Sequence, residues 1–426
     1  MRSSPVANVS GYFDRFVAES HRLRTLVVQP RMGMGNIRTM RAGLGAVAAL
    51  DVAAVGTITI DSYTRVGDYT TSLERLAAGE ELNGYPLVSH PTGATLDMLE
   101  GLYGPGFPVQ VRHGTARPQR VFEKLVEVGL DATEGGPVSY CLPYSRLPLA
   151  DAVDAWAESC RFLAGATEHG HIESFGGCLL GQLCPPSLLV AMGILEGRFF
   201  RQHGVRHLSL SYAQGTLAVQ DRGALRALRT LAAEYLGDTT WHVVLYTYMG
   251  LFPRTPNGAT ALIRDSAQLA RDAGCERMIV KTVSEAWQIP SVSENLTALR
   301  LTAADSGTRS APSALEDAFF EETLHEARMI VEAVLNLDAD VGAALTDAFR
   351  RGLLDIPYCL HQDNRAEATC VIDDRGALAW GERGRLPLPR AAERAAGGGL
   401  GSDELYDMLN HVANRYDTNE FEWGLV

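Results

Sequence analysis

Short apolar runs alternate with longer amphipathic stretches along most of this chain, beginning near residue 25. The short runs are rich in Val, Ile and Thr, which favour strands, whereas the longer stretches repeat their apolar residues at helical spacing. In residues 117–130, Val121, Leu125, Val128 and Leu130 lie close to one face of a predicted helix. Eight runs are predicted strands: residues 25–31, 57–65, 108–114, 134–144, 171–177, 207–214, 241–250 and 278–282.

Helical stretches between these runs predict parallel strands joined by right-handed crossovers. Eight strand–helix units over about 250 residues match a closed (β/α)8 TIM barrel, a fold of the α/β class. A doubly wound sheet stays open as the alternative, although no GxGxxG follows the first strand. The predicted helices of the barrel are residues 38–50, 117–130, 149–163, 186–200, 222–236, with Asp221 as its cap, and 259–273.

The chain beyond the last predicted strand has a different, more helical pattern. We expect an N-terminal segment over 1–24, the barrel over 25–310, and C-terminal helices with an irregular tail over 311–426. The predicted elements of this part are helices at 292–304, 314–337 and 341–352, a hairpin at 370–380 turning at Asp374-Arg375-Gly376, and a flexible linker at 390–401.

Composition and charge narrow the class of protein. The 426 residues are 46% hydrophobic and carry a formal net charge of −13. Such an acidic chain gains little from counterion release, so we expect no nucleic-acid partner, although a few arginines can still bind a small anion. Seven dispersed cysteines without a CxxC pair predict reduced thiols. Because no signal peptide and no run of roughly 20 apolar residues is present, we expect a soluble cytoplasmic protein without membrane contact.

Arginines stand at the ends of the first three predicted strands. Arg31, Arg65 and Arg112 occupy these positions, and His113 follows the last of them. Barrel active sites form where the carboxyl ends of several strands meet, and guanidinium groups match carboxylates in geometry. The three arginines therefore predict a site for a small dicarboxylate. Surface ion pairs are the alternative interpretation.

The remaining strand ends add groups for acid–base and polar chemistry. Glu134 lies among glycines and could accept a proton, while Tyr140 and Tyr144 offer hydroxyls. Lys281 and Glu285 are four residues apart, so they share one face if a helix begins there, and a plain salt bridge is the alternative. Lys281 could also form an imine, as in a lyase or aldolase.

Several common catalytic and metal-binding motifs are absent. The chain has no HExxH, no Walker A motif, no GxSxG and no DxHxxG. The HGH at 169–171 does not have the usual spacing of metal ligands, and we interpret it as part of a loop. We expect no metal ligand from this chain.

These segments together resemble the epsilon (large) subunit of glutamate mutase, also called methylaspartate mutase, which depends on adenosylcobalamin. The resemblance runs from about residue 25 to 360 and is weaker to about 390. Its motifs, in family order, are VVQPR, TITIDSYTR, LNGYP, VQVRHGT, EGGPVSYCLPY, SFGG with CPPS, YMGLFP, IVKTVSEAWQIP and LLDIPY.

The resemblance implies a role for each matching residue. Arg31, Arg65 and Arg112 match an arginine claw for the two substrate carboxylates, and Glu134 matches the residue that receives the substrate amino group. The other matches are Tyr140 and Tyr144, which touch substrate, Lys281 and Glu285, which hold the deoxyadenosyl group, and Thr59, Asn83, Phe175 and Met249, which line the cofactor cavity.

The resemblance also implies a radical isomerisation of L-glutamate to (2S,3S)-3-methylaspartate. The deoxyadenosyl radical takes a hydrogen, the substrate radical fragments to a glycyl radical and acrylate, and these recombine as the branched skeleton. A separate small subunit would bring the cobalamin and the histidine that ligates cobalt. The large subunit is expected to be a homodimer, in an assembly of two large and two small chains.

Some features depart from the family. Pro137 replaces a usual third glycine, LSYAQG is less glycine-rich than expected, and both ends look short. An Ala- and Arg-rich composition indicates a high-GC bacterium, in which the reaction could serve secondary metabolism rather than glutamate fermentation. The exact substrate therefore stays open. The alternatives are a mutase for a related dicarboxylic amino acid, an imine-forming lyase, and a non-catalytic dicarboxylate-binding relative.

Overall fold

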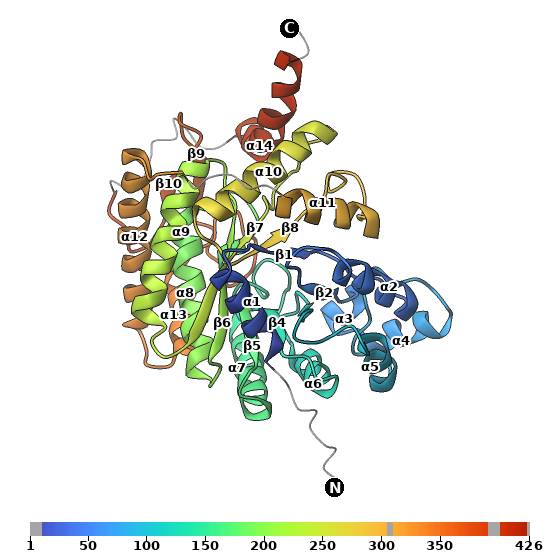
Figure 1. Cartoon of the computed structure of the whole chain (residues 1–426). Coiled ribbons are helices and arrows are strands. Elements are labelled where there is room, and N and C mark those ends of the chain that lie inside the picture. The colour runs from blue at the N-terminus through green and yellow to red at the C-terminus, as the bar shows by residue number, and fades with distance from the viewer. Residues whose placement is uncertain (1–10, 305–309, 391–400, 424–426) are drawn as a thin grey trace.

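Eight parallel strands form the centre of the molecule, and helices surround them (Figure 1). The computed structural model describes residues 11–304, 310–390 and 401–423. Neighbouring strands follow the order β1-β8-β7-β6-β5-β4-β3-β2, and each pair is parallel. The strands are β1 (Val27–Pro30), β2 (Gly56–Thr59), β3 (Val109–Arg112), β4 (Ala132–Gly135), β5 (His171–Ser174), β6 (His207–Ala213), β7 (Thr240–Tyr246) and β8 (Arg277–Val280).

The sheet closes into a barrel between β1 and β2. The Val28 N–H donates to Ala53 O at 2.9 Å, and the Val55 N–H donates to Val28 O at 3.1 Å. Further along, Thr59 N–H donates to Met32 O at 2.9 Å. These bonds join the two ends of the strand order, so the (β/α)8 TIM-barrel prediction is confirmed and the doubly wound alternative is wrong.

Helices follow the strands and cover the barrel from outside. Each of the predicted barrel helices is present within a few residues of its expected bounds. The helices of this part are α1 (Tyr12–Arg22), α2 (Ile37–Ala48), α3 (Ser62–Val66), α4 (Tyr69–Ala77), α5 (Thr92–Leu99), α6 (Gln119–Glu127), α7 (Leu149–Ala166), α8 (Pro186–Gln202), α9 (Ala218–Tyr235), α10 (Pro256–Asp272) and α11 (Val292–Ala304), with a 3₁₀ turn η1 (Gly176–Cys178).

Three local predictions are corrected by the structure. The second strand stops at Thr59 because Asp61 accepts two backbone N–H bonds and begins helix α3, so the expected strand to residue 65 is wrong. The fourth strand stops at Gly135, and turns occupy the rest of 134–144. Asp221 is not a helix cap: α9 already begins at Ala218, and the Asp221 carboxylate accepts the Tyr212 hydroxyl at 2.9 Å.

The interior of the barrel contains a layer of hydrogen-bonded polar side chains, which we call the polar layer: Gln29, Gln110, Glu173 and Arg277. All four are completely buried. Arg277 donates to Gln29 Oε1 at 2.5 Å and pairs with Glu173, while Gln29 donates to Gln110 Oε1 at 2.7 Å. Gln110 completes the layer by donating to Glu173 Oε2 at 3.2 Å. Each charge in the layer therefore has a partner.

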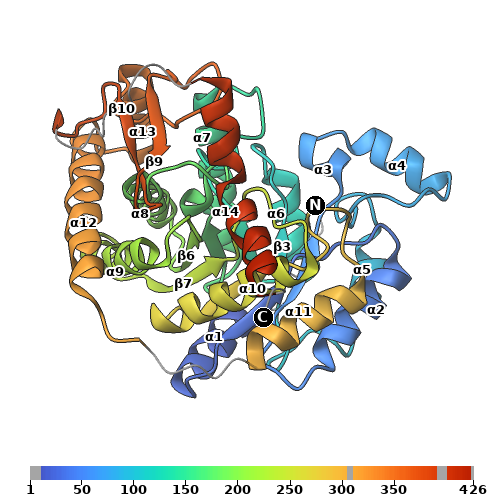
Figure 2. The same cartoon turned by 90° about the horizontal axis from the view of Figure 1, so that it is seen from above.

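The C-terminal part packs against one side of the barrel. Helix α12 lies outside α8 and α9 (Figure 2), and the predicted hairpin is present, with Gly376 in its turn at φ 82°. The tail expected to be irregular forms a helix that contacts α10, where Tyr416 donates to Asp265 at 2.6 Å. The elements are α12 (Ala314–Leu335), α13 (Val341–Arg351), β9 (Ala368–Ile372), β10 (Leu378–Arg383) and α14 (Ser402–Trp423).

Three further predictions concern the linker, membrane-spanning helices and the cysteines. Residues 391–400, most of the predicted linker, lie outside the described residues. Within the described residues, every helix is too short or too polar to cross a lipid bilayer. All seven cysteines are buried free thiols.

Candidate active site

Three side chains from different strands meet at the carboxyl end of the barrel. Arg112 ends β3, Glu134 lies on β4, and Tyr246 ends β7. Arg112 Nε donates to Glu134 Oε2 at 2.7 Å, and the Tyr246 hydroxyl donates to the same oxygen at 2.9 Å. The Arg112 guanidinium also lies 5.4 Å from the centre of the Tyr246 ring. Burial opposes the Arg112 charge, but Glu134 and the nearby tyrosines raise the pKa of Arg112 well above its usual value, so Arg112 is a cation.

Tyr140 reaches Glu134 from a tight turn that only glycine permits. The Tyr140 hydroxyl donates to Glu134 Oε1. Gly135 has φ 131°, and a Cβ there would lie 2.5 Å from both the Trp156 and the Tyr140 ring. Burial and the Glu134 charge raise the pKa of Tyr140, which keeps its hydroxyl a donor. The two glycines that follow Glu134 therefore serve to fold Tyr140 back onto it.

A buried glutamate on helix α8 holds this turn. Glu196 accepts the Ser139 N–H at 2.9 Å, the Val138 N–H at 3.3 Å and the hydroxyls of Ser139 at 3.0 Å and Ser174 at 2.9 Å. A Cβ on Gly136 would lie only 2.0 Å from the Glu196 carboxylate. Burial raises the pKa of Glu196 to about 7. The turn and the helix thus fit together at a single carboxylate.

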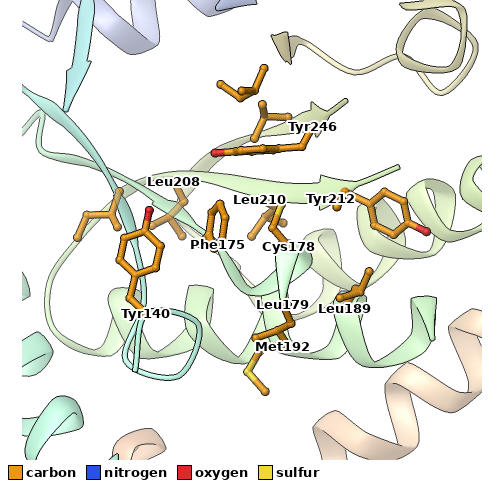
Figure 3. Packing of buried hydrophobic residues seen from close by; sticks show 14 of the residues in the cluster. Tyr140, Phe175, Cys178, Leu179, Leu189, Met192, Leu208, Leu210, Tyr212 and Tyr246 are labelled. Atoms are coloured by element: carbon orange, nitrogen blue, oxygen red, sulfur yellow. The ribbon is translucent and has the colours of Figure 1, made fainter. Parts of the chain in front are cut away.

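Aromatic rings line the site below these polar groups. Phe175 lies between Tyr140 and Tyr246, with ring centres 5.1 and 5.5 Å away (Figure 3). His113 stacks on Trp156 at 5.6 Å and meets the Tyr140 ring at 5.2 Å. Burial, followed by the charge of Arg65, lowers the pKa of His113 to about 3, so this histidine is neutral. Apolar packing thus fixes the rings that carry the hydroxyls.

A second charged group lies at the ends of β1 and β8. Glu285 accepts from Arg31 Nη1 at 2.8 Å and pairs with Lys281 Nζ at 3.2 Å. The predicted Lys281–Glu285 pair is present, but turns carry it, because the next helix begins only at Val292. The Lys281 ammonium lies 5.1 Å from the centre of the Phe252 ring, and burial lowers the pKa of Lys281 to about 8.

Tyr144 and Arg65 lie nearer to solvent. Tyr144 is 47% exposed, and its ring centre lies 6.1 Å from that of Tyr140. Arg65 projects from α3 rather than from a strand end, and its Nε lies 3.2 Å from where a Cβ on Gly114 would be. Arg65 therefore lies over the residues that directly follow Arg112, and the three arginines share one end of the barrel.

The other predicted cavity residues lie at the end of one strand and in two loops. Thr59 ends β2, and its buried hydroxyl has no partner among the described residues. Asn83 is exposed in the loop after α4, which Tyr85 joins to Thr59 by a 2.8 Å backbone bond. Met249 is partly buried after β7, and a Cβ on Gly181 would lie 3.0 Å from it.

Sequence analysis missed two residues that hold Glu134 and its turn. The single Tyr246 hydroxyl lies within hydrogen-bonding distance of both Glu134 and Glu173 of the polar layer, and Glu196 binds the turn. A signal was available for Glu196, which is a lone acidic residue in the otherwise apolar run of α8. No comparable signal marks Tyr246, because tyrosine is common in buried strands.

Comparison with known proteins identifies the family. The family model described as methylaspartate mutase E chain (MutE) matches residues 9–400. The glutamate mutase epsilon subunit of Haloarcula marismortui is 33% identical over 355 residues, which is 78% of this chain and 70% of that protein. The same subunit of Desulfitobacterium hafniense is 32% identical over 395 residues, 88% of this chain and 81% of that protein.

The corresponding subunit of Escherichia coli O157:H7 is 31% identical over 351 residues, covering 78% of this chain and 72% of that protein. The resemblance in the strand-end motifs is thus confirmed over most of the sequence, on a barrel whose carboxyl end carries the matching side chains. This chain belongs to the methylaspartate mutase E chain family, whose members are subunits of an isomerase.

Proposed function

We propose that this chain is the substrate-binding large subunit of an adenosylcobalamin-dependent mutase that interconverts L-glutamate and (2S,3S)-3-methylaspartate. The observation that carries the proposal is the set of guanidinium groups around Glu134. Arg112 bonds to Glu134 through Nε, and among the described residues its two Nη atoms have no partner. Arg65 likewise has no ion-pair partner in the described parts of the chain. The guanidinium groups of Arg112 and Arg65 are therefore available to bind two carboxylates.

Arg31 would supply the third contact. Its Nη1 is paired with Glu285, whereas its buried Nε has no hydrogen-bond partner in the described residues. Tyr144, whose ring centre lies 6.1 Å from that of Tyr140, would add a hydroxyl donor for one of the substrate carboxylates. A dicarboxylate would bring two negative charges to three cations, of which only two are now neutralised by acidic side chains.

Glu134 would bind the substrate ammonium. Its oxygens already face three donors, from Arg112, Tyr140 and Tyr246. An ammonium beside Glu134 would replace part of the Arg112 contact, which frees the guanidinium for the carboxylate next to the amino group. Exchange of one buried cation for another keeps the site neutral and avoids the cost of an unpaired charge.

The residues present fit the adenosyl part of the cofactor. Lys281 and Glu285 offer a donor and an acceptor at the edge of the site, and Thr59 has a buried hydroxyl without a described partner. Ribose hydroxyls and adenine nitrogens need such groups. When bound, adenosylcobalamin supplies a 5′-deoxyadenosyl radical by cobalt–carbon homolysis. This chain would position the substrate beside it and exclude water, with Phe175 and Met249 as apolar walls.

The cobalt-ligating histidine would come from a separate small subunit, because the chain has no DxHxxG motif. Large side chains next to the Lys281–Glu285 pair are exposed: Trp287 by 68%, Ile289 by 71% and Leu251 by 47%. These apolar groups fit a face that the small subunit covers. In keeping with the family, we propose a homodimer of large subunits with one small subunit on each.

The test is isomerisation with the full chain, a cobalamin-binding small subunit, adenosylcobalamin and L-glutamate, followed by NMR. We expect methylaspartate only when both proteins are present. Arg112→Lys removes the planar guanidinium group. We expect transition-state stabilisation to fall by about 2–4 kcal/mol, the cost of losing a buried charged contact, and kcat/KM to fall accordingly. Arg117→Lys, at a 63% exposed side chain, is the matched control. Unchanged kcat/KM in folded Arg112→Lys would contradict the proposal that Arg112 binds a substrate carboxylate.

One observation favours a second function. Lys281 is buried and its pKa is lowered to about 8, as an imine-forming lysine requires. Borohydride trapping with small oxo acids separates the two functions, because an adduct on Lys281 would support a lyase. Formation of a different branched amino acid in the NMR assay would instead indicate a mutase for a related diacid, as in secondary metabolism.

A further inference from the structure

The amino end of the barrel carries a cluster of histidines and carboxylates that the proposed mutase site does not use. His171 begins β5, His207 begins β6 and His242 is the third residue of β7, while α1 brings Asp14 onto them (Figure 1). Asp14 Oδ1 lies 2.9 Å from His171 Nδ1, and Asp14 Oδ2 lies 3.2 Å from His207 Nδ1. Ligand atoms of Asp14, His171 and His242 all lie within 4.8 Å of one another.

The two distances from Asp14 to histidine nitrogens, 2.9 and 3.2 Å, are close to those between ligands of one metal ion. Two ligand atoms bound to a tetrahedral Zn²⁺ at about 2.0–2.1 Å are separated by about 3.3 Å. Asp14 Oδ2 and His207 Nδ1 face each other at 3.2 Å as an ion pair, but both atoms are buried and neither makes a hydrogen bond of good geometry. A simple hydrogen-bonded ion pair would satisfy both atoms, whereas a cation would use the lone pair of each.

Contacts outside the cluster orient its rings. His171 Nε2 lies 2.9 Å from Ser209 Oγ, which leaves Nδ1 facing Asp14. The His242 ring stacks on the His171 ring at 5.3 Å. Arg277 donates to His242 Nε2 over a long 3.4 Å bond that it can give up, because Arg277 is paired with Glu173. The Ser209 contact at the second ring nitrogen of His171 is of the kind found around metal-binding histidines.

The charges near the cluster also suit a cation. Asp131, directly before β4, accepts the Phe13 N–H at 3.4 Å and the Tyr103 hydroxyl at 3.2 Å, so a second carboxylate adjoins α1. Its backbone carbonyl accepts the His171 N–H at 2.7 Å. Two carboxylates would balance a divalent ion, and the partly exposed His207, at 23%, offers it an entry path.

We propose that Asp14, His171 and His242 bind one divalent transition-metal ion of the Zn²⁺ class, and that His207, which now faces the other oxygen of Asp14, completes the ligand set. Three imidazoles and one carboxylate are donors that suit Zn²⁺, Co²⁺ and Ni²⁺ better than Mg²⁺ or Ca²⁺. The ion joins α1 to three strands at the end of the barrel where residues serve stability rather than chemistry. It revises the expectation that this chain supplies no metal ligand.

The test uses the full chain, stripped with a chelator and titrated with Co²⁺. We expect one equivalent to bind with the visible absorption of tetrahedral Co²⁺, and Zn²⁺ to displace it. Asp14→Asn and His207→Ala should weaken Co²⁺ binding by more than about tenfold, the loss that even outer contacts cause. His169→Ala is the matched control, because this exposed histidine lies beside His207, at 5.9 Å between rings, but outside the cluster.

Thermal unfolding gives a second measurement. Zn²⁺ should raise the unfolding temperature of the unmodified chain and of His169→Ala, but not that of Asp14→Asn. No stoichiometric Co²⁺ binding by the unmodified chain would overturn the proposal, as would equal binding by both ligand variants. Since neither readout involves isomerisation, a negative result leaves the proposed function untouched.

Discussion

Gly136→Ala tests whether the turn that carries Tyr140 depends on its fit to Glu196. The added Cβ would lie 2.0 Å from one Glu196 oxygen and 2.3 Å from the other, against a shortest normal contact of about 3 Å. The carboxylate is the end of a flexible chain, but four donors at 2.9–3.3 Å hold it. To make room it must move by about 1 Å, which breaks bonds of this length.

The cost can be worked from those bonds. Each buried donor left without a partner costs about 1–3 kcal/mol, so the loss of two predicts a destabilisation of about 2–6 kcal/mol. We expect urea unfolding, followed by circular dichroism, to show this loss. Gly165→Ala is the control: this glycine lies in α7 with open space around it, and alanine there should be neutral or stabilising by up to about 1 kcal/mol.

A double-mutant cycle isolates the contact between residue 136 and Glu196. Glu196→Ala alone should be destabilising, because the same donors lose their acceptor. In Gly136→Ala/Glu196→Ala the clash is gone, so the double variant should be more stable than the sum of the single effects predicts. Additive effects would refute the contact as the cause, and a Gly136→Ala chain as stable as the unmodified one would refute the geometry itself.

Two further predictions concern the charged groups of the site. Tyr246→Phe keeps the ring on Arg112 but removes the hydroxyl that bonds to Glu134 and Glu173. Urea unfolding should therefore show that the free energy of unfolding falls by about 1.5–3 kcal/mol. No loss would mean that the hydroxyl is not needed. Lys281 is a cation below its lowered pKa of about 8 and neutral above it, so mutase activity should decline as pH rises through 8. Lys281→Arg stays charged and should lose this alkaline decline, whatever its absolute rate, and an identical pH profile in both would exclude Lys281 as its source.

The sequence predicted the barrel because each strand is buried on both faces and reads as a short apolar run between helices. Arg31 and Arg112 were correctly assigned to strand ends for the same reason. Arg65 was not, because the run TITIDSYTR continues a strand-like pattern past Asp61, where a side-chain cap begins a helix. A five-residue helix is too short to show a period.

The contacts that hold Glu134 could not be predicted, because they join residues far apart in the chain. Tyr246 and Glu134 are 112 positions apart, and Glu196 and Ser139 are 57 apart. Local pattern identifies which residues are buried but not which polar groups meet inside a closed barrel. The strand-end residues indicated Glu134 and Tyr140, the family resemblance gave them roles, and only the fold could add their partners.

The polar layer also has a consequence for folding. Gln29, Gln110, Glu173 and Arg277 come from four strands whose apolar neighbours would tolerate a shifted alignment. A strand that slid by two residues would still bury its aliphatic side chains, yet it would leave an amide or a charge facing hydrocarbon, at a cost of several kcal/mol. The network therefore favours the native alignment of the strands, because its hydrogen bonds form only when all four strands are in register.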